Sequence, residues 1–184
     1  MSEQPWKPTV DQQREAYGTT LPDVIGHNLK VLLIGINPSL YSAAVRHHFA
    51  RPGNRFWPAL HKAGITKSQV SPFEDQLLLD VGIGITNVVA EATARADELT
   101  TEQLNQGAVE LELKIQQWLP ECVCFLGITT YRAITGQKKV AVGEQELMFG
   151  GQRTWVLPNP SGLNAHYQID DLAKLFRELH DATS

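Results

Sequence analysis

Short apolar runs are the most regular feature of this chain. Residues 31–34 and 155–157 contain no polar side chain, a pattern typical of strands that are buried on both faces of a parallel sheet. Comparable runs predict strands over residues 30–36, 83–86, 122–127 and 153–157, with a weaker candidate over 145–149. The sequence therefore predicts a sheet of short strands spread along most of the chain.

Helical periodicity fills the intervals between these runs. The clearest helix begins after Thr100, which forms a capping-box pattern with Gln103, and repeats apolar residues at helical spacing until Pro120. Shorter helices are predicted near residues 11–17 and over 54–64, 71–79 and the segment around 172–179. Strands that alternate with helices predict an α/β fold, a single-domain three-layer α/β/α sandwich around a short, mostly parallel central sheet.

The domain organisation is simple, because no repeat, low-complexity tract or linker interrupts the 184 residues. Residues 1–23 are polar and punctuated by proline, so we expect an N-terminal arm followed by one domain over residues 24–184. The arm lacks the pattern of a signal peptide, and no apolar stretch is long enough to span a membrane. We therefore expect no membrane partner and a cytoplasmic location.

The two cysteines, Cys122 and Cys124, lie in one predicted strand and should face the same side of the sheet. Two thiols cannot complete an iron–sulfur centre, so we interpret both as small core residues of a protein from a reducing compartment.

The charge balance argues against broad binding of polyanions, because the net charge is −4. A local basic patch nevertheless lies within residues 46–62, where no acidic residue occurs: Arg46, His47, His48, Arg51, Arg55, His61 and Lys62. The adjacent histidines do not predict a metal site, because no third ligand follows at suitable spacing.

Two asparagines are the strongest candidates for chemistry. Asn37 and Asn159 each follow an apolar run and precede a proline, which disfavours helical conformation at the asparagine. Parallel strands deliver their carboxyl ends to one edge of a sheet, where open α/β sheets bind ligands. We therefore expect both amides at one crevice, and Asn87, which follows the run over 83–86, at the same edge.

The loops around these asparagines allow two interpretations each. Residues 35–57 are polar, basic and aromatic, which suits a loop that stacks a base beside phosphate or a surface loop whose aromatics pack on the sheet. Leu163 stands alone among the turn residues of 158–164, where it either folds back into the core or inserts into a DNA stack.

Three segments in order resemble a known family. They are Gly35-Ile36-Asn37-Pro38, then Pro52-Gly53-Asn54-Arg55-Phe56-Trp57, then Asn159-Pro160-Ser161-Gly162-Leu163. Together they closely resemble the mismatch-specific uracil-DNA glycosylase and thymine-DNA glycosylase family, over roughly residues 29–179. The resemblance implies a uracil-DNA glycosylase-like fold that acts on double-stranded DNA containing uracil or mismatches, an activity with which the expected monomer is compatible. The small size and the lack of a targeting pattern indicate a bacterial cytoplasm, where DNA binding would place the protein near the nucleoid.

The family flips a uracil-like base out of DNA and hydrolyses its N-glycosidic bond without a metal or a cofactor. By match to its motifs, Asn37 would be the catalytic residue and would hold the attacking water. The residues implied to bind the base are Ile36, Ser39, Ser42, Phe49, Asn87 and Asn159. The residues implied to contact DNA are Ser161, Gly162, Leu163, Asn164, His48 and Arg55, with Leu163 as the wedge.

Two positions depart from the family pattern. Ser39 stands where the family usually has glycine, so its side chain either narrows access for a 5-methyl group or adds a hydrogen bond. Asn164 and Ala165 replace the polar or basic residue that some relatives use against the opposite guanine. A strict preference for guanine as the opposing base is therefore not implied.

The leading hypothesis is a monofunctional DNA glycosylase that removes uracil, mainly from G·U mismatches and also from other uracil pairs or related lesions. Neither motif contains lysine, so no lyase step is expected. One alternative is an enzyme of the same fold for another base, such as hypoxanthine. Replacement of Asn87 separates the two hypotheses, because it should abolish a preference for uracil only if Asn87 recognises that base. The others are a non-catalytic lesion-binding module, disfavoured by Asn37, and a small-molecule α/β enzyme, disfavoured by the basic patch.

Overall fold

The computed structural model of this protein describes residues 4–184 and contains one five-stranded sheet. Its strands are β1 (Val31–Gly35), β2 (Ile83–Asn87), β3 (Cys122–Leu126), β4 (Gly143–Phe149) and β5 (Gln152–Leu157). They lie in the order β2-β1-β3-β5-β4, and all neighbours are parallel except β4, which pairs antiparallel with β5. The predicted strands and the mostly parallel sheet are confirmed.

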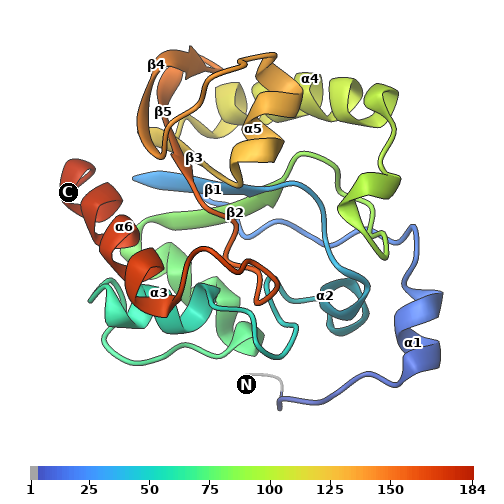
Figure 1. Cartoon of the computed structure of the whole chain (residues 1–184). Helices are drawn as coiled ribbons and strands as arrows, with labels where there is room; N and C mark the ends of the chain where they lie inside the picture. Colours follow the sequence, from blue (N-terminus) through green and yellow to red (C-terminus); the bar gives the residue numbers. More distant parts are fainter. Residues whose placement is uncertain (1–3) are drawn as a thin grey trace.

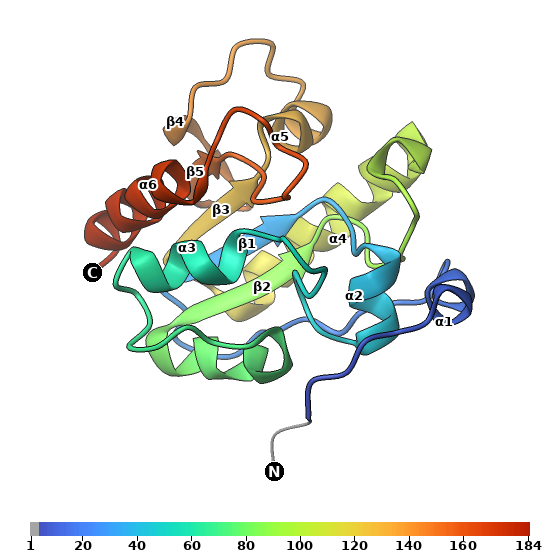
Figure 2. The same ribbon diagram turned by 60° about the horizontal axis from the view of Figure 1, so that its bottom comes forward.

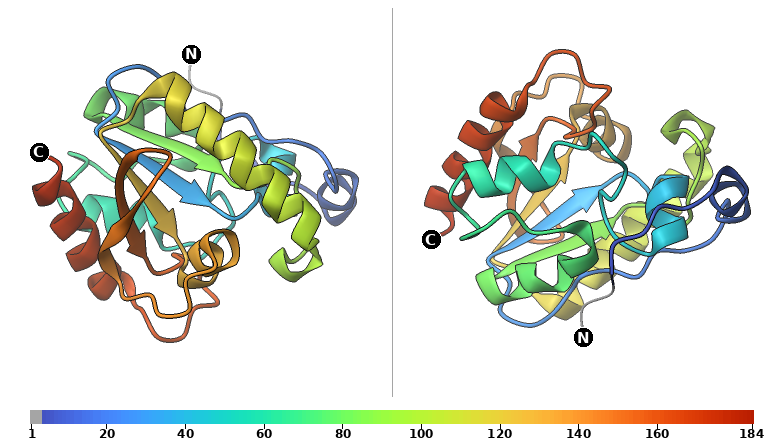
Figure 3. Two further views of the ribbon diagram at one scale, coloured as in Figure 1. Left: turned by 90° about the horizontal axis from the view of Figure 1, so that it is seen from above. Right: turned by 90° about the horizontal axis from the view of Figure 1, so that it is seen from below.

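Helices cover both faces of the sheet (Figure 1). One face carries α3 (Phe56–Lys62) and α6 (Ile169–Ala182), and the other carries α4 (Thr101–Trp118) and α5 (Ile128–Thr135) (Figures 1 and 3). The shorter elements are α1 (Val10–Glu15), α2 (Leu40–Val45) and the 3₁₀ helices η1 (Pro72–Val81) and η2 (Ala96–Glu98). The architecture is the predicted α/β/α sandwich.

Alternation along the strands supplies the two apolar layers. On β1, Val31 and Leu33 belong to the core beneath α3 and α6, whereas Leu32 and Ile34 belong to the core beneath α4 and α5. Cys122 and Cys124 are both free, buried and in the first of these layers, which confirms their interpretation as core residues. Burial raises the pKa of the Cys122 thiol to about 12, so this thiol stays protonated at neutral pH.

Two helices were absent from the sequence prediction. α2 lies inside the stretch that was interpreted as a loop, and it begins where the Ser39 hydroxyl accepts a hydrogen bond from the Ser42 N–H at 3.2 Å. α5 follows Gly127 and consists of residues such as Ile128 and Thr129, whose β-branched side chains have low helix propensity. Its packing against the sheet beside Phe125 stabilises it instead.

The first part of the chain is fastened to the strand edge that leads to the site. The N–H of Gly18 donates to the carbonyl of Ala92 at 2.9 Å, and Val24 pairs antiparallel with Ile85 of β2. The predicted short N-terminal helix is present as α1, which lies beside α2 (Figure 2). A division between arm and domain at residue 23 stays a prediction.

None of the helices within residues 4–184 combines the length and the apolar character that crossing a membrane requires.

Candidate active site

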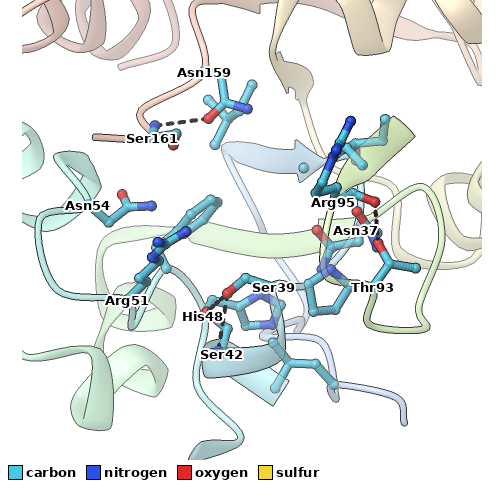
Figure 4. Close-up of a pocket in the computed structure, with 18 of the residues that line it drawn as sticks. Asn37, Ser39, Ser42, His48, Arg51, Asn54, Thr93, Arg95, Asn159 and Ser161 are labelled. Atoms are coloured by element: carbon cyan, nitrogen blue, oxygen red, sulfur yellow. Dashed lines mark hydrogen bonds between the residues drawn. The ribbon is translucent and has the colours of Figure 1, made fainter. Parts of the chain in front are cut away.

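A pocket of about 440 Å³ opens at the carboxyl ends of the parallel strands (Figure 4). Its walls come from the segments that follow β1, β2 and β5. Asn37, Asn87 and Asn159 all line it, which confirms the expectation that the three amides share one crevice. Its volume lies in the range of pockets that hold small ligands.

Asn37 is held in one orientation by hydrogen bonds from its amide nitrogen. Nδ2 donates to the carbonyl of Glu91 at 3.1 Å and to Oγ1 of Thr93 at 2.8 Å. The Thr93 hydroxyl in turn donates to the carbonyl of Arg95 at 2.8 Å. Because a carbonyl only accepts, the NH₂ group must face this segment. Oδ1 of Asn37 is thus left as an acceptor that no donor within residues 4–184 occupies.

Asn87 ends β2 directly opposite Gly35 of β1, and only 7% of its surface is exposed. A Cβ atom on Gly35 would lie 2.6 Å from Oδ1 of Asn87, so the amide occupies the space that the glycine leaves open. Its side chain forms no hydrogen bond within the described part of the chain. Both the donor and the acceptor of this amide are therefore available to a ligand in the pocket.

Phe49 forms an aromatic wall of the pocket. Its backbone has a positive φ of 52°, and its ring stacks on Phe56 with 4.2 Å between ring centroids. The flanking chain is fixed on both sides, because the Trp57 indole N–H donates to the carbonyl of His48 at 3.2 Å and the Ala50 N–H donates to Oγ of Ser42 at 3.2 Å. A rigid ring is the arrangement that base stacking requires.

Ser39 and Ser42 form a hydroxyl pair beneath this wall. The hydroxyl of Ser39 donates to that of Ser42 at 3.2 Å. Both residues line the pocket, and Ser39 also begins α2. The serine that replaces the usual glycine therefore has a structural function in addition to any effect on access.

His48, a predicted DNA contact, is buried and does not lie at the surface. The residue is 2% exposed, and Nε2 of its ring lies 2.8 Å from the carbonyl oxygen of Pro22. Burial lowers the pKa of this imidazole, which keeps it neutral at physiological pH. His48 supports the floor of the pocket and offers no surface charge to a phosphate.

The guanidinium of Arg55, a predicted DNA contact, binds the protein itself in this structure. Nη1 donates to the carbonyls of Asn164 at 2.6 Å and Tyr167 at 2.8 Å, and Nη2 donates to the carbonyl of Gly162 at 3.3 Å. The backbone N–H of Arg55 donates to the carbonyl of Pro160 at 2.9 Å. This arginine holds the loop after β5 in place.

Leu163 projects from that loop with 81% of its surface exposed, so the alternative in which it folds back into the core is wrong. Ser161 donates its N–H to Oδ1 of Asn159 at 2.9 Å, and Asn164 donates Nδ2 to the Asn159 carbonyl at 3.1 Å. A Cβ atom on Gly162 would lie 2.5 Å from the carbonyl oxygen of Gly53, so the loop packs tightly against residues 51–54. An exposed leucine thus stands on a turn that is held by hydrogen bonds and close packing.

The basic patch of the sequence is divided in the fold. His47 lies 3.2 Å from the carboxylate of Asp75, and Lys62 forms an ion pair with Asp170. Arg51 remains exposed at the pocket. Residues 46–62 contain no acidic residue, but Asp75 and Asp170 from other parts of the sequence pack against them and reduce the positive charge of the patch.

Sequence reasoning missed the segment over residues 93–97, which supplies Thr93, Arg95 and Asp97 to the pocket. The available signal was its place directly after β2, at the same sheet edge as the asparagines. Within residues 4–184 the structure holds no cluster of three or more side chains suited to a metal ion.

An α/β/α sandwich with a pocket at the carboxyl ends of its parallel strands has the fold class of the uracil DNA glycosylases. The family model of the Uracil DNA glycosylase superfamily matches residues 22–180, and the chain belongs to this superfamily. A solution NMR structure of a protein from Methanosarcina acetivorans, described as a proposed uracil DNA glycosylase, is similar to it. The TM-score is 0.57 at 20% identity, over 88% of this chain and 97% of that chain, and at this identity the likeness shows the fold alone.

Proposed function

We propose that this protein is a monofunctional DNA glycosylase of the mismatch-specific branch. It flips uracil out of duplex DNA, mainly from G·U mismatches, and hydrolyses the N-glycosidic bond. The observation that carries the proposal is Asn37, whose amide nitrogen is bound by the segment after β2 while Oδ1 remains an open acceptor in the pocket.

In the proposed reaction, Oδ1 of Asn37 accepts a hydrogen bond from a water and orients it toward C1′ of the flipped nucleotide. Cleavage of a glycosidic bond passes through an oxocarbenium-like state, so a well-oriented water suffices when the leaving base is stabilised. The backbone N–H of Ile36, at the end of β1, is the proposed donor to the departing base. An amide is a very weak base, so we expect slow turnover.

Uracil would be recognised by Phe49 and Asn87 together. The base would stack on the ring of Phe49, which itself stacks on Phe56. The amide of Asn87 can donate to O4 of uracil and accept from its N3–H, a pair of contacts that cytosine cannot satisfy. The hydroxyls of Ser39 and Ser42 would lie near the C5 side of the base.

The loop after β5 would hold the DNA in its opened form. Leu163 would occupy the space that the flipped nucleotide leaves in the stack. Ser161, Gly162 and Asn164 would contact the adjacent backbone, with Asn159 close to the target nucleotide. No lysine lines the pocket among the residues described, which supports hydrolysis without a Schiff-base step.

The test is a single-turnover cleavage assay on matched duplexes that contain G·U, A·U, G·T, G·hypoxanthine or no lesion. Wild type is compared with Asn37→Ala and with Asn105→Ala, a matched control at an exposed position of α4. We expect uracil release by wild type and the control, and a loss of about 100-fold or more in Asn37→Ala. Duplex binding without release by wild type would instead identify a lesion-binding module.

A further inference from the structure

Two arginines stand at the exposed rim of the pocket, Arg51 on the segment after α2 and Arg95 on the segment after β2 (Figure 4). They differ in their surroundings. Within the described residues, Arg51 forms no ion pair. Arg95, by contrast, binds the carboxylate of Asp97 through two of its guanidinium nitrogens. Nε of Arg95 lies 3.0 Å from Oδ1, and Nη2 contacts Oδ2.

The pair between Arg95 and Asp97 is placed where it can be exchanged. The two side chains are 74% and 62% exposed, so water screens the attraction and the pair contributes little to stability. A bidentate carboxylate also occupies the same two donors that a guanidinium offers to a phosphate. Asp97 therefore binds the two guanidinium donors of Arg95 that a phosphate would use, and it binds them only weakly.

The backbone beneath Arg95 is fixed, although its side chain is exposed. The Arg95 N–H donates to Oε1 of Glu98 at 2.7 Å, and its carbonyl accepts from the Thr93 hydroxyl at 2.8 Å. That hydroxyl also accepts from Asn37. The guanidinium is thus presented from the same segment that orients the candidate catalytic amide.

From this arrangement we infer that Arg95 binds a DNA phosphate at the mouth of the pocket and that Asp97 occupies its guanidinium until DNA arrives. Binding exchanges one anionic partner for another, and the phosphate next to the flipped nucleotide takes the place of the carboxylate. Arg51 contacts the backbone on the opposite side without such a competitor. The inference rests on the proposed function in that DNA is the ligand.

The test is a double-mutant cycle on DNA affinity. The probe is a fluorescent duplex with a tetrahydrofuran abasic analogue opposite guanine, which the protein can bind but not hydrolyse, titrated by anisotropy at several salt concentrations. We expect Arg95→Gln to weaken binding about 10-fold near 0.1 M salt and to reduce the slope of log K against log salt by about 1. Asp97→Asn should strengthen binding about 2–5-fold.

The decisive quantity is the change in DNA affinity that Asp97→Asn causes when Arg95 is also replaced. In the Arg95→Gln background it should shrink to that of Glu102→Gln, a control that removes one acidic charge at an exposed position of α4 that forms no ion pair with an arginine within residues 4–184. In the Arg51→Gln background the Asp97→Asn effect should persist in full. An Asp97→Asn effect of equal size with and without Arg95, or Arg95→Gln with unchanged affinity, would overturn the inference.

Two further comparisons keep the test independent of folding and of the proposed activity. Arg95→Lys keeps the charge but loses the paired donors of the guanidinium. It should therefore bind more weakly than wild type with an unchanged slope of log K against log salt. Thermal unfolding of each variant shows whether it is folded. Uracil release by wild type is measured in parallel. Release without coupling between Arg95 and Asp97 overturns this inference alone, and coupling without release overturns the glycosylase alone.

Discussion

The hydroxyl of Thr93 should determine how fast this protein cleaves, although we assign it no contact with substrate. Thr93→Val keeps the shape of the side chain and removes one hydrogen bond at 2.8 Å from Asn37 and one at 2.8 Å to the Arg95 carbonyl. At about 0.5–1.5 kcal/mol each, the two bonds together contribute about 1–3 kcal/mol to folding. Thr93 is 7% exposed, so little water replaces them.

Thr93→Val should lower the rate of uracil release less than Asn37→Ala, which removes the amide itself. Asn37 keeps its 3.1 Å bond to the Glu91 carbonyl in Thr93→Val, so Oδ1 loses one of two constraints on its direction. An orientation cost of about 1.4 kcal/mol corresponds to a single-turnover rate about 10-fold below wild type. The assay is uracil release from a G·U duplex at saturating enzyme, so that weaker binding does not enter the rate.

Thr93→Ser is the matched control, because it keeps the hydroxyl and loses only a methyl group. We expect it to stay within about 3-fold of the wild-type rate. A Thr93→Val enzyme that cleaves at the wild-type rate would refute the reasoning. So would equal losses in the valine and serine variants, because the methyl group and not the hydroxyl would then be responsible.

Four further predictions concern the pocket and its loop. Gly35→Ala should displace the amide of Asn87 and lower single-turnover uracil release about 10-fold or more, because its Cβ would lie 2.6 Å from Oδ1. Arg55→Ala should loosen the loop after β5, which limited proteolysis would detect as faster cleavage there. Leu163→Ala should weaken binding to a G·U duplex by about 3–10-fold without lowering the melting temperature, because the side chain is 81% exposed. His48→Gln should flatten the loss of melting temperature that wild type shows as the pH falls below about 6.5.

The sign of the pH effect follows from the lowered pKa of His48. Below its ordinary value of 6.5 the unfolded chain binds a proton that the buried ring resists, so stability falls as the pH falls. Equal pH profiles of wild type and His48→Gln would contradict this, and the exposed His166→Gln serves as control.

Each of the other three changes has a counterpart that should have little effect. Gly26→Ala places its Cβ 3.7 Å from the nearest atom, an ordinary contact, and should cleave normally. Arg132→Ala removes an exposed arginine of α5, and Leu113→Ala removes a leucine of α4 that is 61% exposed. A control that behaves like its test variant would show that size or charge alone explains the result.

Much of the sheet could be predicted because its signal is local. β1 and β3 are apolar along their whole length, and β5 is apolar over its last three residues. The rule that parallel strands end at one edge was then enough to bring Asn37, Asn87 and Asn159 together. α4 was equally clear, since Thr100 and Gln103 form the predicted capping box. Neither inference depends on knowing a distant contact.

The parts that could not be predicted depend on contacts across the fold. From the sequence, Arg55 is an ordinary surface cation. In the fold its guanidinium donates to backbone carbonyls within residues 162–167, more than a hundred positions later in the chain. His48 is buried against Pro22, a contact that no local pattern encodes. α5 is stabilised by packing against Phe125 despite its β-branched residues. The Arg95 pair was missed because its segment has neither a motif nor periodicity.

The attachment of the loop after β5 has a consequence for redesign. Arg55 grips this turn through the carbonyls of Gly162, Asn164 and Tyr167, and these are groups that every amino acid supplies. The side chains of Ala165 and His166 are exposed. Their identities can therefore be changed while the path of the turn is kept. A library at these two positions would therefore vary the exposed surface of the turn on an unchanged scaffold.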